Sequence, residues 1–468
     1  MSLFNAGIQY NFLASINRAN TALNQNLLRM STGLRINSAA YDPAGLIASE
    51  FLRGNMAAVD AQIDNISRAD SVVATADGGL EEISTLLTEI KGLVVASSST
   101  GGLSDAEIQA NQLQIDQAVA SIQRIAGTTS FNGQSLLNGA QSFRTTGLDT
   151  AAIEDLAIHA ATTAAGSQAV SVEVTSVAER GMVTASTAGV GGSAVTLEVA
   201  GNRGTATISL TASSSNAAIA AAVNAETGDT GVSATASSNG SIYFTSSEFG
   251  SSEFVSVEAT SGTYSLNGES RDEGEDATVT VNGQSAAASG LEVTYATGGL
   301  DLSFSLSESF GTSASTSSFS VTSGGSAFSI GGELVEVGIE SVSPAHLGAS
   351  RYGYLTSLRS GGANDVTGAT ASQLANAEDI VDSAISQVSS MRGRLGGFQS
   401  MTLDPMSNSL TEAFTQMTNA ESDIRSLDFT EEFASYTRNQ ILLEAATGGL
   451  SALMGTTRSM STLILSLF

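Results

Sequence analysis

The chain has 468 residues, a formal net charge of −28 and only 14% charged residues. A phosphate backbone is bound through clustered lysine and arginine, so this balance excludes an ordinary nucleic-acid-binding protein. The chain has no cysteine and no tryptophan, which excludes disulfides and thiol chemistry.

The start of the chain predicts neither a secretory leader nor a membrane anchor. The first 20 residues, MSLFNAGIQYNFLASINRAN, lack a basic segment followed by a continuous apolar run. No apolar run approaches the roughly 18 residues that a membrane-spanning helix needs. We therefore expect no membrane insertion. The chain is expected to be cytoplasmic or, as the alternative, exported by a route that needs no cleaved signal.

A polar break separates two predicted helices within residues 30–46, MSTGLRINSAAYDPAGL. Gly33 suits the left-handed end of the first helix. Asp42 and Pro43 suit the N-cap and the first turn of the second. Because Arg35 and Asn37 add directional hydrogen-bonding groups, the stretch predicts a rigid joint rather than a flexible linker.

The second helix continues into a long apolar stripe with spacings of three and four, as in a coiled coil. Its seam consists of Val59, Ile63, Ile66, Ala69, Val73, Ala76, Leu80, Ile83, Leu87, Ile90 and Val94. A polar break follows, in which Ser104 and Glu107 fit a capping box for the next helix. The sequence FNGQSLLNG then closes this helical zone with two turn-forming Asn-Gly pairs.

The middle of the chain, residues 166–324, predicts strands. It is rich in Ser, Thr, Gly and Ala, and short runs such as AVSVEVTSV and LDLSFSLS alternate with period two. One helical insert, SNAAIAAAVNAETG, interrupts them. Residues 145–345 carry 22 acidic and 3 basic residues, a net charge of −19, so most of the acidity lies here.

The last 95 residues return to a helical pattern. Their stripe consists of Leu374, Ala377, Val381, Ala384, Val388, Met391, Leu395 and Phe398. Asp404 and Pro405 predict a break before the final helical segments. Each stripe residue contributes about 1.5–3 kcal/mol when buried, so the two stripes are expected to pack together. The sequence thus predicts a multi-domain α+β fold: antiparallel terminal helices form a long coiled-coil stalk, and a β-rich domain is inserted between them.

Both ends of the chain resemble bacterial flagellin. The N-terminal match is carried by NLLRMSTGLRINSAAYDPAGLIASE, ISRADSVVATADGGLEEISTLLTEIKGLVV and TTSFNGQSLLNG. The C-terminal match is carried by VSSMRGRLGGFQSM, ESDIRSLDFTEEFASYTRNQILLEAATGGLSAL and LILSLF. In the middle, residues 205–237 resemble the IN motif of some flagellins and hook-associated proteins.

The resemblance implies a structural subunit of the flagellar filament, which is secreted unfolded through the flagellar type III apparatus and assembles outside the cell for swimming. It implies an inner-tube helical pair (1–44 with 430–468), an outer-tube coiled-coil domain (45–165 with 325–429) and a variable surface domain (166–324). Its implied partners are other copies of the chain, an export chaperone, the filament cap protein and the hook–filament junction protein. The joint of Gly33, Arg35, Asn37, Asp42 and Pro43 would link the two shells of the tube.

The two ends are each too short to bury a core alone, so we expect them to fold only against neighbouring subunits. An apolar face near the C-terminus is the expected polymerisation surface, which a chaperone would cover before export. It consists of Ile441, Leu442, Leu450, Leu453, Leu463, Leu465 and Leu467. An ordinary core helix is the alternative reading of this face.

Recognition by animal innate-immune receptors is expected to be weak. In the family, an arginine in a QRIRELAV-like stretch carries much of that contact. Here the stretch is TEIKGLVV, with Glu89 at the arginine's place, and Ser121 replaces a glutamate on the next helix. Replacing Arg by Glu removes a bidentate donor and reverses the charge.

No enzyme, cofactor or metal site is predicted. The two histidines, His159 and His346, are far apart and neither begins an HExxH motif, so structural roles are expected. The acidic stretch 269–276 lacks calcium-loop spacing. The principal alternative function is the hook–filament junction protein, which shares the terminal helical pattern and which the YDP at 41–43 favours. Surface O-linked sugars on the middle domain are a further expectation, with unmodified serines as the alternative.

Overall fold

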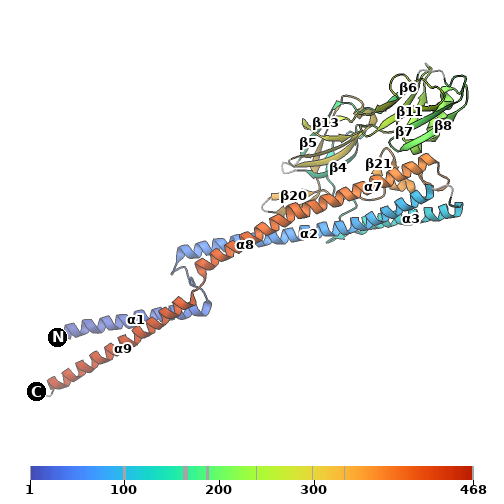
Figure 1. Ribbon diagram of the computed structural model, residues 1–468. Helices are drawn as coiled ribbons and strands as arrows, with labels where there is room; N and C mark the ends of the chain where they lie inside the picture. The colour runs from blue at the N-terminus through green and yellow to red at the C-terminus, as the bar shows by residue number, and fades with distance from the viewer. Residues whose placement is uncertain are drawn as a thin grey trace. The chain divides into compact units, whose positions relative to one another are not determined.

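The computed structural model describes residues 2–98, 102–161, 167–185, 189–238, 240–297, 299–330 and 333–465. The chain forms two compact units, which are described separately. The first unit comprises Met1–Asp64 and Pro405–Phe468, and the second comprises Asn65–Asp404. The α+β class is confirmed, because helices occupy both ends of the sequence and strands occupy its middle (Figure 1).

The helices and strands follow the predicted order along the chain. The helices are α1 (Ser2–Thr32), α2 (Pro43–Ser98), α3 (Asp105–Thr128), α4 (Asn216–Ala225), α5 (Thr227–Thr230), α6 (Glu308–Gly311), a 3-10 turn (Leu355–Leu358), α7 (Ala371–Phe398), a π-helical turn (Gln399–Leu403), α8 (Asp404–Arg425) and α9 (Phe429–Leu465). The strands are β1 (Ser130–Phe131), β2 (Gln134–Ser135), β3 (Arg144–Thr146), β4 (Ile153–Ala161), β5 (Gln168–Ser176), β6 (Met182–Ala185), β7 (Val195–Gly201), β8 (Gly204–Leu210), β9 (Val232–Ala236), β10 (Ile242–Ser246), β11 (Phe254–Ser261), β12 (Arg271–Glu273), β13 (Thr278–Val281), β14 (Gln284–Ser285), β15 (Ala287–Ser289), β16 (Glu292–Thr297), β17 (Leu300–Leu306), β18 (Thr316–Ser323), β19 (Ser326–Ile330), β20 (Glu333–Val337), β21 (Gly348–Ala349) and β22 (Gly353–Tyr354).

In the second unit, α2 and α7 run antiparallel beside each other (Figure 1). Lys91 on α2 forms an ion pair with Asp382 on α7, with 2.5 Å between Nζ and Oδ1. Nearer the start of α2, Asp77 lies 2.8 Å from Arg392, nearer the end of α7. Residues later in α2 therefore contact residues earlier in α7, as they do in an antiparallel pair of helices. Because each helix turns its apolar stripe inward, the predicted return of the chain onto its own start is confirmed.

Two adjacent leucines of α2 test how much this stripe contributes to stability. The side chain of Leu87 is fully buried, whereas Leu86 is only half-buried. We expect Leu87→Ala to lower the free energy of unfolding by about 2–5 kcal/mol, since it leaves a cavity in a packed core. Leu86→Ala is the matched control and should cost less than half as much. Urea denaturation of the full chain measures both, and equal losses would contradict the assigned seam.

The start of α3 confirms the predicted capping residues. The carboxylate of Glu107 accepts hydrogen bonds from the Ser104 backbone N–H, at 2.7 Å, and from the Ser104 hydroxyl, at 2.8 Å. These two bonds lower the pKa of Glu107 below its usual range, because they favour the ionised form. Further on, Asn132 and Gly133 both have positive φ in the turn between β1 and β2, as an Asn-Gly hairpin requires.

The predicted break at Asp404 and Pro405 is wrong. The backbone stays helical from α7 through the π-helical turn into α8. The Asp404 N–H donates to the carbonyl of Gln399, five residues back, which is the π-helical pattern. Proline is tolerated in the first turn of a helix, and Pro405 is the second residue of α8. Because Pro405 has no N–H to donate, the wider π turn lets α8 begin there without a break in the helical backbone.

The strands of the second unit build two separate cores. In the first, a five-stranded sheet (β14-β13-β5-β18-β3) and a four-stranded sheet (β15-β16-β17-β4) contribute to one apolar cluster that includes Val172 and Phe304. In the second, the sheets β6-β10-β9 and β12-β11-β7-β8 share a cluster with α4, which contributes Ile219 and Val223. The predicted helical insert is thus α4, packed as part of a core.

The three-part domain division stays a prediction. Two strands that precede residue 166, β3 and β4, pair with β18 and β17. The sheet of the variable region therefore begins before that predicted boundary. The first compact unit also extends past residue 44, to Asp64.

Candidate assembly joint and terminal helices

The joint lies in the first unit, where α1 ends and α2 begins. Gly33 has a φ of +69°, which is the left-handed conformation expected at a helix end. Its N–H donates to the carbonyl of Arg29 at 2.8 Å and so closes the last turn of α1. Residues with a Cβ pay a steric cost in this conformation, so glycine suits the position.

The chain leaving α1 pairs with the chain that joins α8 to α9. Leu34 and Ser426 form an isolated antiparallel bridge. On one side of it the Arg35 N–H donates to the Arg425 carbonyl at 2.8 Å, and on the other the Leu427 N–H donates to the Gly33 carbonyl at 3.1 Å. This short pairing gives the backbone groups of both connections partners that the helices no longer provide.

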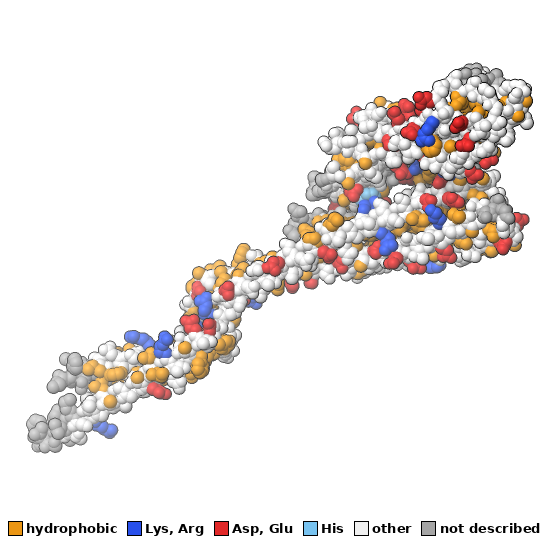
Figure 2. All heavy atoms as spheres, viewed as in Figure 1, with side chains coloured by type: hydrophobic (Ala, Val, Ile, Leu, Met, Phe, Trp, Pro, Cys, Tyr) orange, Lys and Arg blue, Asp and Glu red, His pale blue; other side chains and the backbone are white. Residues whose placement is uncertain are grey.

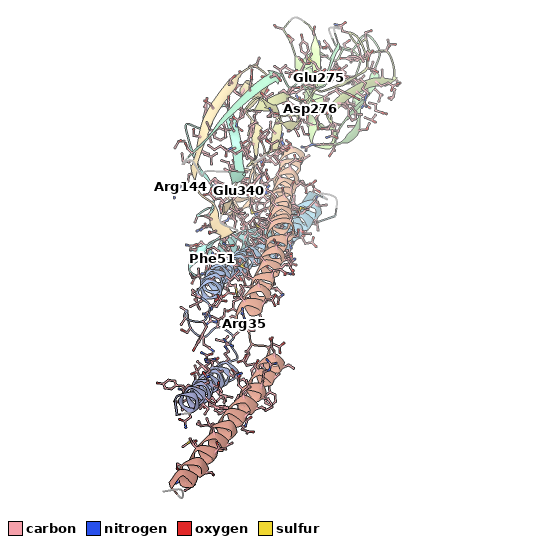
Figure 3. All side chains as sticks on the ribbon, turned by 90° about the vertical axis from the view of Figure 1, so that its left-hand side faces the viewer. Arg35, Phe51, Arg144, Glu275, Asp276 and Glu340 are labelled. Atoms are coloured by element: carbon pink, nitrogen blue, oxygen red, sulfur yellow. The ribbon has the colours of Figure 1, made fainter. Side chains whose placement is uncertain are left out.

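The side chains of the joint add further bonds. The Arg35 guanidinium donates to the carbonyl of Ile424 at 2.5 Å, from the position labelled in Figure 3. The Asn37 amide donates to the Leu34 carbonyl at 3.0 Å. Ile36 lies between them in sequence and is buried, with 1% of its surface exposed. The segment therefore combines polar contacts with an apolar contact, unlike a solvated linker.

The start of α2 is fixed by Asp42. Its Oδ1 accepts the N–H of Gly45 at 2.8 Å, so Asp42 is the N-cap, and Pro43 is the first residue of the helix. A Cβ on Gly45 would meet the Asp42 carboxylate and would lie 2.6 Å from Cδ1 of Ile36. Any larger residue at position 45 would therefore displace the side chains of Asp42 and Ile36, which both belong to the joint.

The returning chain supplies residues that sequence reasoning missed. Arg425 forms an ion pair with Glu50 of α2 at 3.1 Å. Asp428 begins α9, because its Oδ1 accepts the N–H of Thr430 at 2.8 Å. The only local signal was Asp428 followed by Phe-Thr-Glu-Glu, which is typical of a helix start. Nothing in the sequence indicated that this segment would pair with residues 33–35.

The helices α1 and α9 lie side by side and antiparallel in the same unit. Arg29 of α1 is 3.7 Å from the carboxylate of Glu432, near the start of α9. Farther along, Phe12 lies against Gly449, where a Cβ would be 2.6 Å from the phenyl ring. The pairing therefore extends over much of both helices.

The pair buries little apolar surface. The predicted polymerisation face is open at Ile441 and Leu442, which are 60% and 54% exposed. Leu450 and Leu453 are half-buried. The side chains of Leu463 and Leu465, and Leu467 as a whole, lie outside the described residues.

Most predicted seam residues are buried in the second unit. Val59 and Ile63, which belong to the first unit, are half-buried. The buried members are Ile66, Val73, Leu80, Ile83, Leu87, Ile90, Val94, Leu374, Val381, Val388, Met391 and Leu395.

Exposed apolar side chains concentrate in the first unit. Among the described residues, sixteen large apolar side chains are exposed, and twelve of these lie in the first unit although it is the smaller one. Those on its surface are Tyr10, Leu13, Leu27, Leu28, Tyr41, Ile47, Phe51, Phe429, Phe433, Ile441, Leu442 and Met454. Figure 2 shows orange hydrophobic side chains gathered along the helices of this unit. Apolar patches of this kind mark surfaces that bind another protein.

The acidic stretch 269–276 bonds to its own backbone surroundings. Asp276, labelled in Figure 3, accepts the N–H groups of Ser251 and Gly290 at 3.0 and 2.7 Å. Although burial raises the pKa of Asp276, these bonds and one from the Ser251 hydroxyl lower it overall. Across the described ranges, no group of three or more His, Asp or Glu side chains has the arrangement of a metal site.

Comparison with protein families gives three matches. Residues 5–142 match the bacterial flagellin N-terminal helical region, and residues 379–465 match the C-terminal helical region. Residues 194–248 match the flagellin hook IN motif, a range that contains the predicted 205–237. These matches confirm the resemblance at both ends and in the middle.

Known relatives agree with these matches. Polar flagellin F of Vibrio parahaemolyticus is 38% identical over 122 residues, which span 26% of this chain and 32% of the relative. The chain thus aligns with about a third of that protein. B-type flagellin of Pseudomonas aeruginosa is 27% identical over 93% of this chain and 94% of its own length. The solved structure of FliC from Burkholderia pseudomallei is 14% identical over 71% of this chain and 98% of its own, with a TM-score of 0.25.

Proposed function

The chain belongs to the flagellin family, and from this premise we propose that it is a structural subunit of the bacterial flagellar filament. The observation that carries the proposal is the concentration of exposed apolar side chains on the first unit, which also holds both chain ends. Such a surface is costly in water and favours association with further copies.

The family is a family of structural proteins, which supports a role without catalysis. Among the described residues, no helix is both long and apolar enough to cross a bilayer. We propose that the chain acts outside the cell, in the filament. The remaining proposed partners are an export chaperone on the face at Ile441 and Leu442, the cap protein and the junction protein.

We propose that innate-immune receptors recognise this chain only weakly, because of the residues at two positions, 89 and 121. Glu89 is exposed on α2, where it presents a negative charge to solvent. Ser121 on α3 is half-buried, and its hydroxyl donates to the Gln117 carbonyl. Glu89 lacks the bidentate donor of the family's arginine, and Ser121 lacks the carboxylate of the family's glutamate.

Seeded growth separates the filament subunit from a junction protein. We expect the purified chain, added to short filament fragments made from itself, to extend them until the free protein reaches a constant concentration. A subunit that adds to its own kind has no fixed stopping length. Electron microscopy measures filament length over time. Growth that stops after one layer at the fragment ends would instead support the junction protein.

A further inference from the structure

His159, on β4, is a buried histidine that contacts side chains of three other segments. Its side chain is 6% exposed. The Nδ1 atom lies 2.7 Å from Oε1 of Glu340, in the segment that follows β20. The Nε2 atom lies 3.1 Å from the hydroxyl of Ser303 on β17 and 2.9 Å from Nη1 of Arg394 on α7. Figure 3 labels Glu340 where the strands come near α7.

These contacts require one protonation state of the ring. A guanidinium has only donors, so the bond with Arg394 requires that Nε2 accept. The ring proton must then be on Nδ1, facing the carboxylate of Glu340. The two ring nitrogens therefore face different groups: Nε2 accepts from Arg394, and Nδ1 lies beside Glu340.

The cluster lies on a cavity of about 660 Å³ between the sheet of β4, β16 and β17 and the helix α7. His159, Glu340 and Arg394 all line this cavity, together with Asp155, Glu292 and His346. Burial lowers the pKa of Arg394, and the negative charges of Glu340 and Asp301 oppose that effect. Among the described residues, Glu340 is the carboxylate that lies within 4 Å of both His159 and Arg394, at 2.7 and 3.9 Å.

We propose that His159, Glu340 and Arg394 form a proton-sensitive latch that holds β4 against the last turns of α7. With Nε2 unprotonated, Arg394 donates to the ring, and the Nδ1 side of the ring lies against Oε1 of Glu340. Protonation places an N–H on Nε2, opposite the N–H of Arg394, and this bond is lost. Two cations then compete for a single carboxylate. Acid therefore loosens the contact between the sheet and the helix, whereas neutral conditions close it.

The test is hydrogen–deuterium exchange of the full-length chain at pH 8 and pH 5, conditions on either side of the range in which imidazoles titrate. After correction for the intrinsic pH dependence of exchange, amides of β4 and of residues 391–398 should exchange roughly tenfold faster at pH 5, as expected for the loss of one charged hydrogen bond. His346→Gln, which removes the only other histidine, is the matched control and should behave like the natural chain.

Two variants distinguish the latch from general acid loosening. His159→Gln keeps an acceptor for Arg394 and a donor for Glu340 but cannot titrate, so the acid effect should disappear. Arg394→Ala should exchange quickly at pH 8 and gain nothing at pH 5. An acid effect that persists in His159→Gln would overturn the proposal. So would a ring-¹⁵N spectrum at pH 8 that shows the His159 proton on Nε2.

Discussion

Deletion of residues 450–468 is expected to abolish filament formation while leaving the second unit folded. The deletion removes the part of α9 beyond Gly449, which lies against Phe12 of α1. Because the two helices are antiparallel, the start of α1 then loses its partner helix. Met454, 57% exposed, is among the apolar side chains removed. The first turns of α1, before Phe12, would then have no partner, and an isolated helical segment shorter than about 12–15 residues is marginal in water. This end of the unit would no longer present an ordered surface to other copies.

The measurement is the concentration of free protein at which filaments first form, by sedimentation and electron microscopy. Protein purified without passage through the export apparatus should be used, so that a defect in secretion does not resemble a defect in assembly. The truncated chain should stay soluble at every concentration tested. The thermal midpoint of the second unit should be the same in the truncated chain as in the whole chain. Filaments that form at the ordinary concentration would disprove the role given to this end.

Much of the helical architecture could be predicted, because a stripe of apolar residues at spacings of three and four has few other physical meanings. Leu80 and Leu374 belong to stripes more than 270 positions apart, yet both are buried as expected. Each stripe needed a partner, and the chain offered only one of sufficient length. The strands were predictable for the same reason, since alternation with period two places every second residue in a core.

The contacts between distant segments could not be predicted. The pairing of Leu34 with Ser426 depends on backbone groups, which every residue carries, so no side-chain pattern marks it. The contact of His159 with Arg394 spans 235 positions and depends on the sheet being placed against α7. The π-helical turn before Pro405 was missed because proline predicts an end to a helix unless the preceding turn widens.

Replacement of Arg35 by alanine is expected to weaken assembly much more than it weakens folding. The residue is exposed, and its guanidinium donates to one carbonyl, that of Ile424. Loss of such a bond in contact with water costs about 1 kcal/mol or less. The backbone bond from Arg35 to Arg425 remains, so the joint still forms. The thermal midpoint of the free chain should therefore change little.

In a filament, the same small loss recurs in every subunit. If the joint sets the direction of the terminal helices, these helices are less ordered in a free subunit whose joint is loosened. Each such subunit must then order them when it adds to the end of the filament. A cost of about 1 kcal/mol per addition raises the concentration of free protein at equilibrium about fivefold. Arg53→Ala is the matched control, because Arg53 is an exposed arginine on the same unit and its ion pair with Glu50, at 3.2 Å, stays within α2.

Arg53→Ala should assemble at the same concentration as the natural chain, whereas Arg35→Ala should require several times more protein. Swimming speed in cells that carry each variant as their sole flagellin should fall in the same order. Equal assembly and equal swimming for the two variants would show that residues 33–43 act only as a linker and not as a rigid joint. A large fall in the thermal midpoint of Arg35→Ala would instead place its effect in folding. Only a defect confined to assembly supports a joint that directs one helical pair relative to its neighbours in the polymer.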